Sequence, residues 1–80
     1  MMNREGILRR VIALFATMAD TDEDITAESE LIEDLGISSM DVLFLISSLE
    51  EEFQIKVSEK AFRKIVTIED VVDTVVSLIQ

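Results

Sequence analysis

The 80-residue sequence has no cysteine, histidine or proline and only two glycines. Without cysteine there can be no disulfide, thiolate metal site or cysteine nucleophile. Without histidine the commonest metal ligand and the usual general base are missing, which excludes a Ser–His–Asp hydrolase. The lack of proline and the scarcity of glycine favour helices over a β fold rich in turns.

Positive charge is also scarce, with 7 Lys and Arg against 17 Asp and Glu and a formal net charge of −10. A nucleic-acid phosphate backbone would be repelled, so we expect no nucleic-acid partner. The acidity suggests partner proteins with basic patches, although it can equally serve only to keep the chain in solution.

Long apolar runs are missing as well. No stretch approaches the roughly 20 apolar residues that a membrane span needs. The first residues, MMNREGILRR, lack the features of a secretory signal. We expect a cytoplasmic protein without stable membrane association.

Hydrophobic residues make up 49% of the chain, and their spacing predicts helices. The predicted fold is all-α, a small four-helix bundle of three longer helices and one short helix, forming a single domain over residues 1–80. The expected helices cover residues 4–18, 39–53, 59–64 and a last segment that starts at Thr67. Polar residues stand where each helix would need an N-cap: Asn3, Ser38, Ser58 and Thr67.

The acid-rich segment 19–34 is predicted to be a long surface connection, tethered to the core by Ile25, Leu31 and Ile32. A loop of this length is unusual in a small domain and needs a reason. One hypothesis is that the first two long helices pack parallel, which requires a long return.

The same segment offers a calcium-site alternative, since Asp20, Asp22 and Asp24 alternate as in an EF-hand loop. Ile25 occupies the place that needs glycine, and Leu31 the place that needs a bidentate glutamate. We therefore predict no metal site.

Two adjacent serines precede the second long helix. Gly36 can adopt a positive φ that turns the chain into this helix, and Ser38 with Asp41 forms an S-x-x-D capping pattern. Ser39 then falls at the first helical position, where its hydroxyl has no capping role and lies at the positive end of the helix dipole. This is a favourable place to attach a phosphate. From these residues alone, an ordinary polar first-turn serine is the favoured interpretation.

The wider segment ELIEDLGISSMDVLFLISSLEEEF resembles the attachment region of acyl carrier proteins. The hallmark of that family is E-D-L-G-x-D-S-L/M-D before an apolar helix that ends in L-E-E-E-F. The matching positions are Glu33, Asp34, Leu35, Gly36, Ser39, Met40, Asp41, Leu49, Glu50, Glu51, Glu52 and Phe53. The resemblance continues through Ile55, Val57, Ala61, Ile65 and the last helix, and so covers nearly the whole chain.

The resemblance implies a carrier that is not an enzyme and has no catalytic residues. In that family a phosphopantetheinyl transferase, using coenzyme A and Mg²⁺, attaches 4′-phosphopantetheine covalently to a serine, which would be Ser39 here. The arm would hold acyl intermediates of fatty-acid or related lipid or specialised biosynthesis as thioesters. Acyl-transfer and synthase enzymes with basic docking patches would bind the second long helix of a monomeric carrier. The residues expected to contact these partners are Met40, Asp41, Phe44, Glu50 and Glu51.

The chain also departs from the family. Ser38 stands where aspartate is usual, and Phe44 where an acid is common, so that Phe44 is either a partner anchor or part of the bundle edge. A basic cluster surrounds the short third helix, where it either forms a solvated face or serves a specialised set of enzymes: Lys56, Lys60, Arg63 and Lys64. The open alternatives are a polyketide, peptidyl or aminoacyl carrier and an unmodified helical interaction module.

Overall fold

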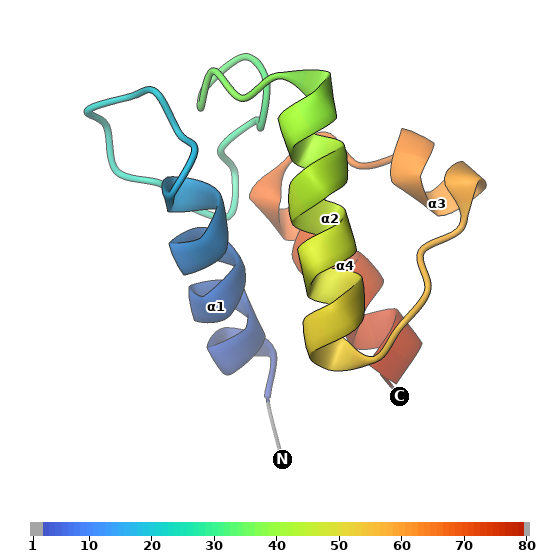
Figure 1. Cartoon of the computed structure of the whole chain (residues 1–80). Helices are drawn as coiled ribbons and strands as arrows, with labels where there is room; N and C mark the ends of the chain where they lie inside the picture. Colours follow the sequence, from blue (N-terminus) through green and yellow to red (C-terminus); the bar gives the residue numbers. More distant parts are fainter. Residues whose placement is uncertain (1–2, 80) are drawn as a thin grey trace.

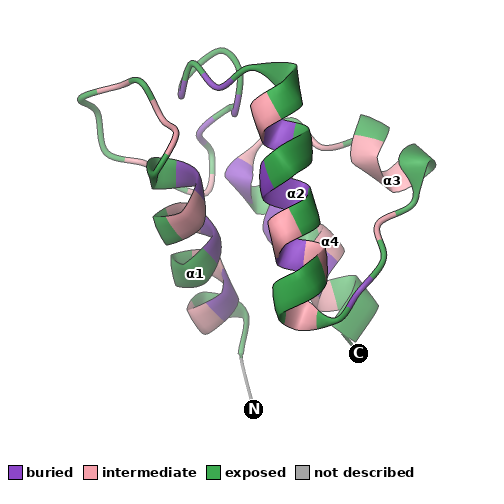
Figure 2. Ribbon diagram, viewed as in Figure 1, coloured by how far each residue is buried: buried purple, intermediate pink, exposed green. Residues whose placement is uncertain are grey.

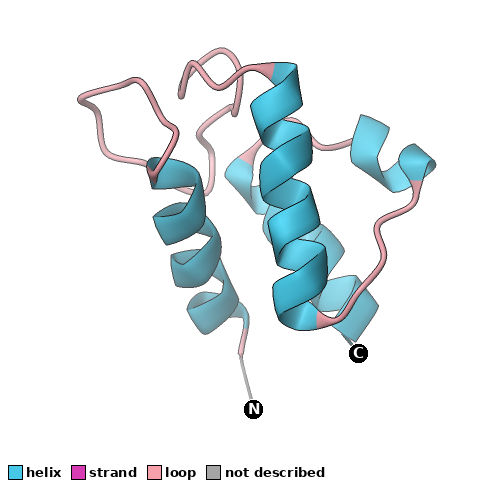
Figure 3. Ribbon diagram, viewed as in Figure 1, coloured by secondary structure: helices cyan, strands magenta, loops and turns pink. Residues whose placement is uncertain are grey.

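A computed structural model describes residues 3–79 and shows the arrangement of the helices (Figure 1). Within this range the chain forms α1 (Arg4–Ala16), α2 (Ser39–Phe53), α3 (Glu59–Arg63) and α4 (Ile68–Ile79). Figure 3 draws only helices and loops for these residues. Their only β-type pairing is an isolated bridge between Glu30 and Thr67. The predicted all-α bundle of three longer helices and one short helix is confirmed.

The helices begin at the polar residues that the sequence predicts as caps. Asn3 Oδ1 accepts a hydrogen bond from the first turn of α1 at 2.8 Å, and Ser58 Oγ accepts one from α3 at 3.1 Å. At the start of α4 the Asp70 amide donates to Thr67 Oγ1 (3.1 Å) and the Thr67 amide donates to Asp70 Oδ2 (3.0 Å). This reciprocal capping box satisfies two amides that lack a partner inside the helix.

One apolar core joins α1, α2 and α4 (Figure 2). The main helix contacts are between α1 and α4, and α2 also packs on α4. The core residues come mostly from the helices, with additions from the segments between them: Ile7, Val11, Phe15, Leu31, Leu35, Ile37, Val42, Leu45, Ile46, Leu49, Ile55, Ile68, Val71, Val72 and Val75. Leu78 and Ile79, which the α4 pattern places in the apolar face, are exposed because they lie in the last turn at the end of the bundle.

The direction of the helices corrects one hypothesis. In Figure 1, α1 runs upward from the N-terminus, whereas α2 runs downward from its first residue. The two helices are antiparallel, so the long connection does not serve a parallel pair.

The long connection instead crosses to the start of α4. The Leu31 amide donates to the Val66 carbonyl at 2.9 Å, and the Ile68 amide donates to the Ser29 carbonyl at 3.0 Å. Leu31 is buried and Ile25 half-buried, as predicted. Ile32 is exposed, contrary to the prediction, because the turn after Leu31 directs the next side chain away from the core.

A surface ion pair joins α1 to α2. Arg10 Nε and Nη2 donate to Glu52 Oε2 and Oε1 at 2.6 and 2.7 Å, a bidentate geometry. The hydrogen bonds from Arg10 lower the pKa of Glu52 below its ordinary value of 4.5. The unpaired Glu52 of the unfolded chain therefore binds a proton more readily than the folded one.

This pKa shift predicts how Glu52→Gln changes stability with pH. A carboxyl with a lowered folded pKa stabilises the fold above its unfolded pKa, and this contribution disappears as the pH falls through the folded pKa. The wild type should melt above Glu52→Gln at about pH 7, and the two melting temperatures should converge below about pH 4.5. Thermal melts followed by circular dichroism would measure both. Glu51→Gln, which removes an exposed carboxylate at the next position, is the control; an equal pH-dependent difference there would contradict the assignment.

Candidate functional site

The two adjacent serines at the start of α2 have different surroundings. Ser38 is the N-cap, and its Oγ accepts a hydrogen bond from the Asp41 amide at 3.2 Å. Its carbonyl accepts one from the Val42 amide at 2.9 Å. Ser39 is the first helical residue and is exposed, and its hydroxyl makes no hydrogen bond with any of residues 3–79. Of the pair, Ser38 is engaged in the cap and Ser39 presents a free hydroxyl.

The turn before α2 needs the glycine that the sequence predicts there. Gly36 has φ +68°, and its amide donates to the Ile32 carbonyl at 3.1 Å. A Cβ on Gly36 would lie 3.4 Å from the Asp20 Cβ, while the Asp20 amide donates to the Leu35 carbonyl at 2.7 Å. This turn sets the position from which α2 starts, and with it the direction of Ser39.

Gly36→Ala should destabilise the protein by about 1–2 kcal/mol, the cost of a left-handed conformation for a residue with a Cβ. Gly6→Ala is the matched control, because Gly6 lies in α1 with no positive φ and its added Cβ would meet only Asn3 Oδ1 at 3.4 Å. Alanine there should stabilise the helix by roughly 0.5–1 kcal/mol. Urea denaturation of both variants would measure the two effects, and equal signs would contradict the role of the turn.

The position of Ser39 suits a phosphodiester. The first amides of a helix lack acceptors inside the helix, and they lie at the positive end of its dipole. A phosphate bound to Ser39 Oγ would sit beside the amides of the first turn and face solvent. The one acid of this turn, Asp41, is half-buried and lies two residues further on. The residues present therefore fit a phosphate-linked group at Ser39.

Two cavities with apolar side chains in their walls lie beside α2. One of about 240 Å³ lies between the start of α2 and the segment before α4, and is lined by Glu30, Leu31, Ile32, Glu33, Val42, Ile65 and Val66. The other, of about 260 Å³, lies between α2 and α3, and is lined by Leu43, Ile46, Ser47, Glu50, Val57, Glu59 and Phe62. Apolar walls of this kind can take an aliphatic chain out of water.

The predicted partner-contact residues are all on α2 but are not equivalent. Met40 is 74% exposed and Phe44 is 58% exposed, so Phe44 is not part of the core. Glu51 is exposed and Asp41 half-buried. Glu50 has an internal role that the sequence pattern does not reveal, because its Oε2 accepts a hydrogen bond from the amide of Val57 at 2.7 Å. It holds the extended connector to α3 against α2.

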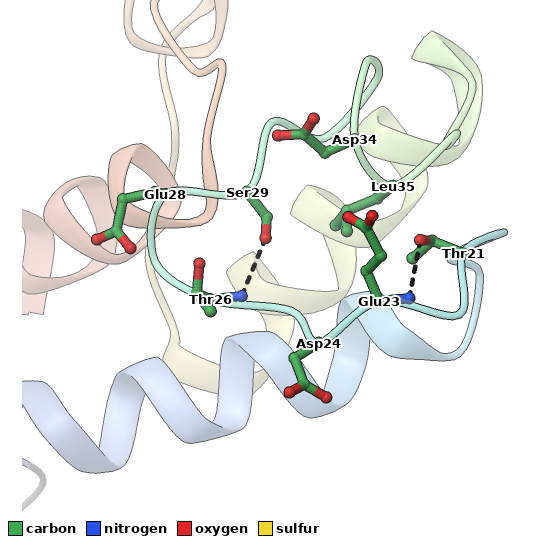
Figure 4. Close-up of a pocket in the computed structure, with 8 residues that line it drawn as sticks. All are labelled: Thr21, Glu23, Asp24, Thr26, Glu28, Ser29, Asp34 and Leu35. Atoms are coloured by element: carbon green, nitrogen blue, oxygen red, sulfur yellow. Dashed lines mark hydrogen bonds between the residues drawn. The ribbon is translucent and has the colours of Figure 1, made fainter.

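The acidic loop encloses a polar pocket (Figure 4). Within it the Thr26 amide donates to Ser29 Oγ at 2.9 Å, which explains why Ser29 is buried. In Figure 4 the carboxylates of Asp24, Glu28 and Asp34 point in different directions. The pocket is thus organised by hydrogen bonds within the loop, and its carboxylates do not converge.

The four bases of the basic cluster are exposed around α3. Arg63 Nη2 lies 2.6 Å from Glu59 Oε1, so one of the four positive charges is paired on the same helix. The distribution of charge along the chain is therefore reproduced in space, with bases around α3 and acids on the loop.

No helix within residues 3–79 is long and apolar enough to cross a bilayer.

Comparison with known proteins places these features in a family. The family model described as "Phosphopantetheine attachment site" matches residues 9–75. An acyl carrier protein of Campylobacter jejuni subsp. doylei is 41% identical over 69 residues, covering 85% of this chain and 90% of the relative. An acyl carrier protein of Rubrobacter xylanophilus is 38% identical over 76 residues, covering 94% of each chain. A solved structure from Mycobacterium tuberculosis, assigned as an acyl carrier protein, aligns with a TM-score of 0.80 and 34% identity over 89% of this chain and 96% of that one.

The chain belongs to the acyl carrier protein family, whose defining feature is the phosphopantetheine attachment domain. Its prosthetic group is a covalently attached 4′-phosphopantetheine. The resemblance found in the residues around Ser39 is confirmed at the level of the family, the fold and the cofactor.

Proposed function

We propose that this protein, as a single domain, holds acyl intermediates as thioesters on a 4′-phosphopantetheine arm bound to Ser39 and presents them to enzymes of fatty-acid or related lipid or specialised biosynthesis. The observation that carries the proposal is the free, exposed hydroxyl of Ser39 at the start of α2. The carrier has no reaction of its own and works as a cytoplasmic monomer.

The attachment step uses an oxygen that the chain supplies and a thiol that it lacks. The Ser39 hydroxyl would attack the phosphorus of coenzyme A that bears the pantetheine, forming the O–P bond while adenosine 3′,5′-bisphosphate leaves and the hydroxyl proton passes to a base of the transferase. Because the sequence contains no cysteine, the sulfur of the arm is the only thiol that can carry an acyl group. The chain's part is to expose Ser39 and keep Ser38 engaged in the cap.

Partner enzymes would approach the outer face of α2, next to the arm. The carboxylates of Asp41 and Glu51 would steer them through basic groups, since charge complementarity chiefly raises association rates. Met40 and Phe44 would add apolar contact. Glu50 contributes to this face indirectly by fixing the connector to α3.

The two cavities beside α2 support a role with acyl groups. Both include apolar side chains in their walls, and both are lined in part by the helix that starts at Ser39. An acyl chain would be shielded there from water, at roughly 0.8 kcal/mol for each buried methylene.

The test is incubation of the purified chain with coenzyme A, Mg²⁺ and a phosphopantetheinyl transferase. The intact mass should rise by one phosphopantetheine, and peptide mapping should place the added mass on Ser39. A further incubation with an acyl donor and its acyltransferase should add an acyl group that hydroxylamine removes. The lack of any mass gain with several transferases would overturn the proposal and favour an unmodified interaction module.

A further inference from the structure

All the lysines of the chain lie in one short segment around α3: Lys56, Lys60 and Lys64. Within residues 3–79 every arginine has a carboxylate partner at 2.6–2.8 Å, in the pairs Arg4–Asp73, Arg9–Glu5, Arg10–Glu52 and Arg63–Glu59. The lysines form no ion pair with any residue of this range, although the chain has 17 acids for only 7 bases. The unpaired positive charge is therefore gathered in these three side chains, which we call the lysine patch.

The fold itself gains little from the lysine patch. All three side chains are exposed. Lys60 and Lys64 stand four residues apart on one side of a helical segment, since Lys64 keeps a right-handed backbone with φ −89° and ψ −6°, and like charges at this spacing are destabilising. The dipole of α3 favours bases at its C-terminal end, but Lys56 precedes the helix. Contacts inside the protein therefore do not account for the arrangement.

The lysine patch lies apart from the acidic loop. In Figure 1, α3 lies to the right of α2, whereas α1 and the beginning of the acidic loop lie to its left. Glu50 and Glu51 share a surface hollow with Lys56. Glu50 Oε2 accepts the Val57 amide at 2.7 Å, and neither carboxylate forms an ion pair with a lysine of the described chain. The ammonium groups are thus open to a partner.

Screening lets the lysine patch act locally in spite of the net charge. Residues 56–64 contain four bases and one acid, which gives a charge of +3 inside a chain of −10. At about 0.1 M salt the Debye length is about 10 Å, and the molecule measures 33 × 25 × 18 Å. A group that docks on α3 therefore interacts mainly with the positive segment, because acids on the far side of the molecule are largely screened.

We infer that the lysine patch is a second docking surface, separate from the attachment serine, and that it binds an acidic surface segment of a partner protein, a run of Asp and Glu side chains. The inference goes beyond the proposed function, because it concerns neither the arm nor the enzymes with basic patches. It gives the carrier two surfaces of opposite charge, each suited to a different class of partner.

The surroundings of the lysine patch favour a protein over an anionic membrane or a second copy of the chain. Stable binding to a bilayer surface needs apolar side chains that insert beside the bases, and within residues 56–66 the only exposed large apolar side chain is Val66, at 51%. A second copy could supply carboxylates, but two chains of −10 would then hold the rest of their acids close together. An acidic segment of another protein pairs with the ammonium groups without either cost.

The experiment titrates a capped hexaglutamate peptide, as the probe, into the isotope-labelled full chain and follows backbone amides by two-dimensional NMR. At about 0.1 M NaCl the shift changes should be concentrated in residues 56–66, and raising NaCl to about 0.5 M should weaken binding about threefold or more. The double variant Lys60→Gln, Lys64→Gln should bind about three- to tenfold more weakly, because two exposed ion pairs with the peptide are lost.

The matched control is the double variant Arg4→Gln, Arg9→Gln. Both double variants take the formal net charge from −10 to −12, but the control removes bases of α1, outside the lysine patch, and breaks only surface ion pairs. It should change binding less than about twofold. An equal weakening in the two variants, or shift changes absent from residues 56–66, would overturn the inference.

Three further measurements complete the test. Co-sedimentation with phosphatidylglycerol vesicles that the lysine variant abolishes would make the patch a membrane surface, and self-association that it abolishes would make the partner a second copy; either result would overturn the inference. A melting temperature of the lysine variant lower by more than about 5 °C would show that these lysines stabilise the fold, and would overturn it too. Mass gain on Ser39 is measured independently, so the proposed function stands or falls separately.

Discussion

Ser39→Ala should gain no mass with coenzyme A and a phosphopantetheinyl transferase, whereas Ser38→Ala should still gain one phosphopantetheine. The two serines are neighbours in sequence but differ in their duties. The Ser38 hydroxyl accepts the amide of Asp41 at 3.2 Å, while that of Ser39 is exposed and makes no hydrogen bond within residues 3–79. Intact-mass spectrometry distinguishes the variants in one experiment, because one should lose the mass gain completely and the other should retain it.

The two variants should rank in the opposite order for stability: the variant that keeps the modification should lose more stability than the one that cannot be modified. Ser38→Ala removes an N-cap and should cost about 1 kcal/mol of stability. Ser39→Ala replaces an exposed first-turn residue and should change stability by less than about 0.5 kcal/mol. Modification of Ser39→Ala at Ser38, or stabilities in the opposite order, would contradict this division of labour.

Phe15→Ala should lower the free energy of unfolding by about 3–5 kcal/mol, the usual cost of truncating a buried phenylalanine. Phe15 is fully buried and lies in α1, which packs on α4. A domain of this length has a total stability of roughly 4–12 kcal/mol, so this loss removes a large fraction of it and should lower the melting temperature well below that of the wild type. Urea denaturation followed by circular dichroism would measure the loss.

The control for this prediction is Leu78→Ala, since this side chain is exposed in the last turn of α4. It should cost about 1 kcal/mol or less. Similar losses for the two variants would show that the core is not centred on the contact of α1 with α4.

Helix positions were predictable because their determinants are local. Ser38 as cap, Ser39 as first residue and Phe53 as last residue of α2 all follow from capping chemistry and apolar spacing, and the structure reproduces them. The reciprocal box of Thr67 and Asp70 is another case, since both partners lie within one turn. The free hydroxyl of Ser39 follows from the same register.

Features that depend on distant residues were not predictable in this way. Glu50 meets the amide of Val57 only because the chain reverses at Gln54, which adopts a left-handed conformation with φ 56°. Glutamine there carries no turn signal comparable to glycine. The antiparallel course of α1 and α2, and the pairing of Arg10 with Glu52, likewise need the packed bundle.

The candidate site likewise combines features that follow from local sequence with features that need the packed bundle. The residues alone indicate a hydroxyl suited to a phosphate, whereas the prosthetic group follows from the resemblance and from the family match over residues 9–75. The exposure of Met40 and Phe44 is a helical-periodicity result. Glu50 and Glu52 form hydrogen bonds that exist only in the packed bundle. These bonds change which side chains of α2 are available to partners.

The two cavities beside α2 have outer walls that are held in place with different strength. The wall near the long loop is joined to the start of α4 by backbone hydrogen bonds, including Leu31 to Val66 and Ile68 to Ser29. In the other cavity the wall facing α2 is α3, which has only five residues, none of them fully buried. Segments with few buried contacts open at lower free energy than the core. We therefore expect the range of acyl-chain lengths that fit to depend on how far α3 can move away from α2. The mobility of α3, more than the volume of the cavity at rest, would then set the longest acyl chain that the carrier can shelter.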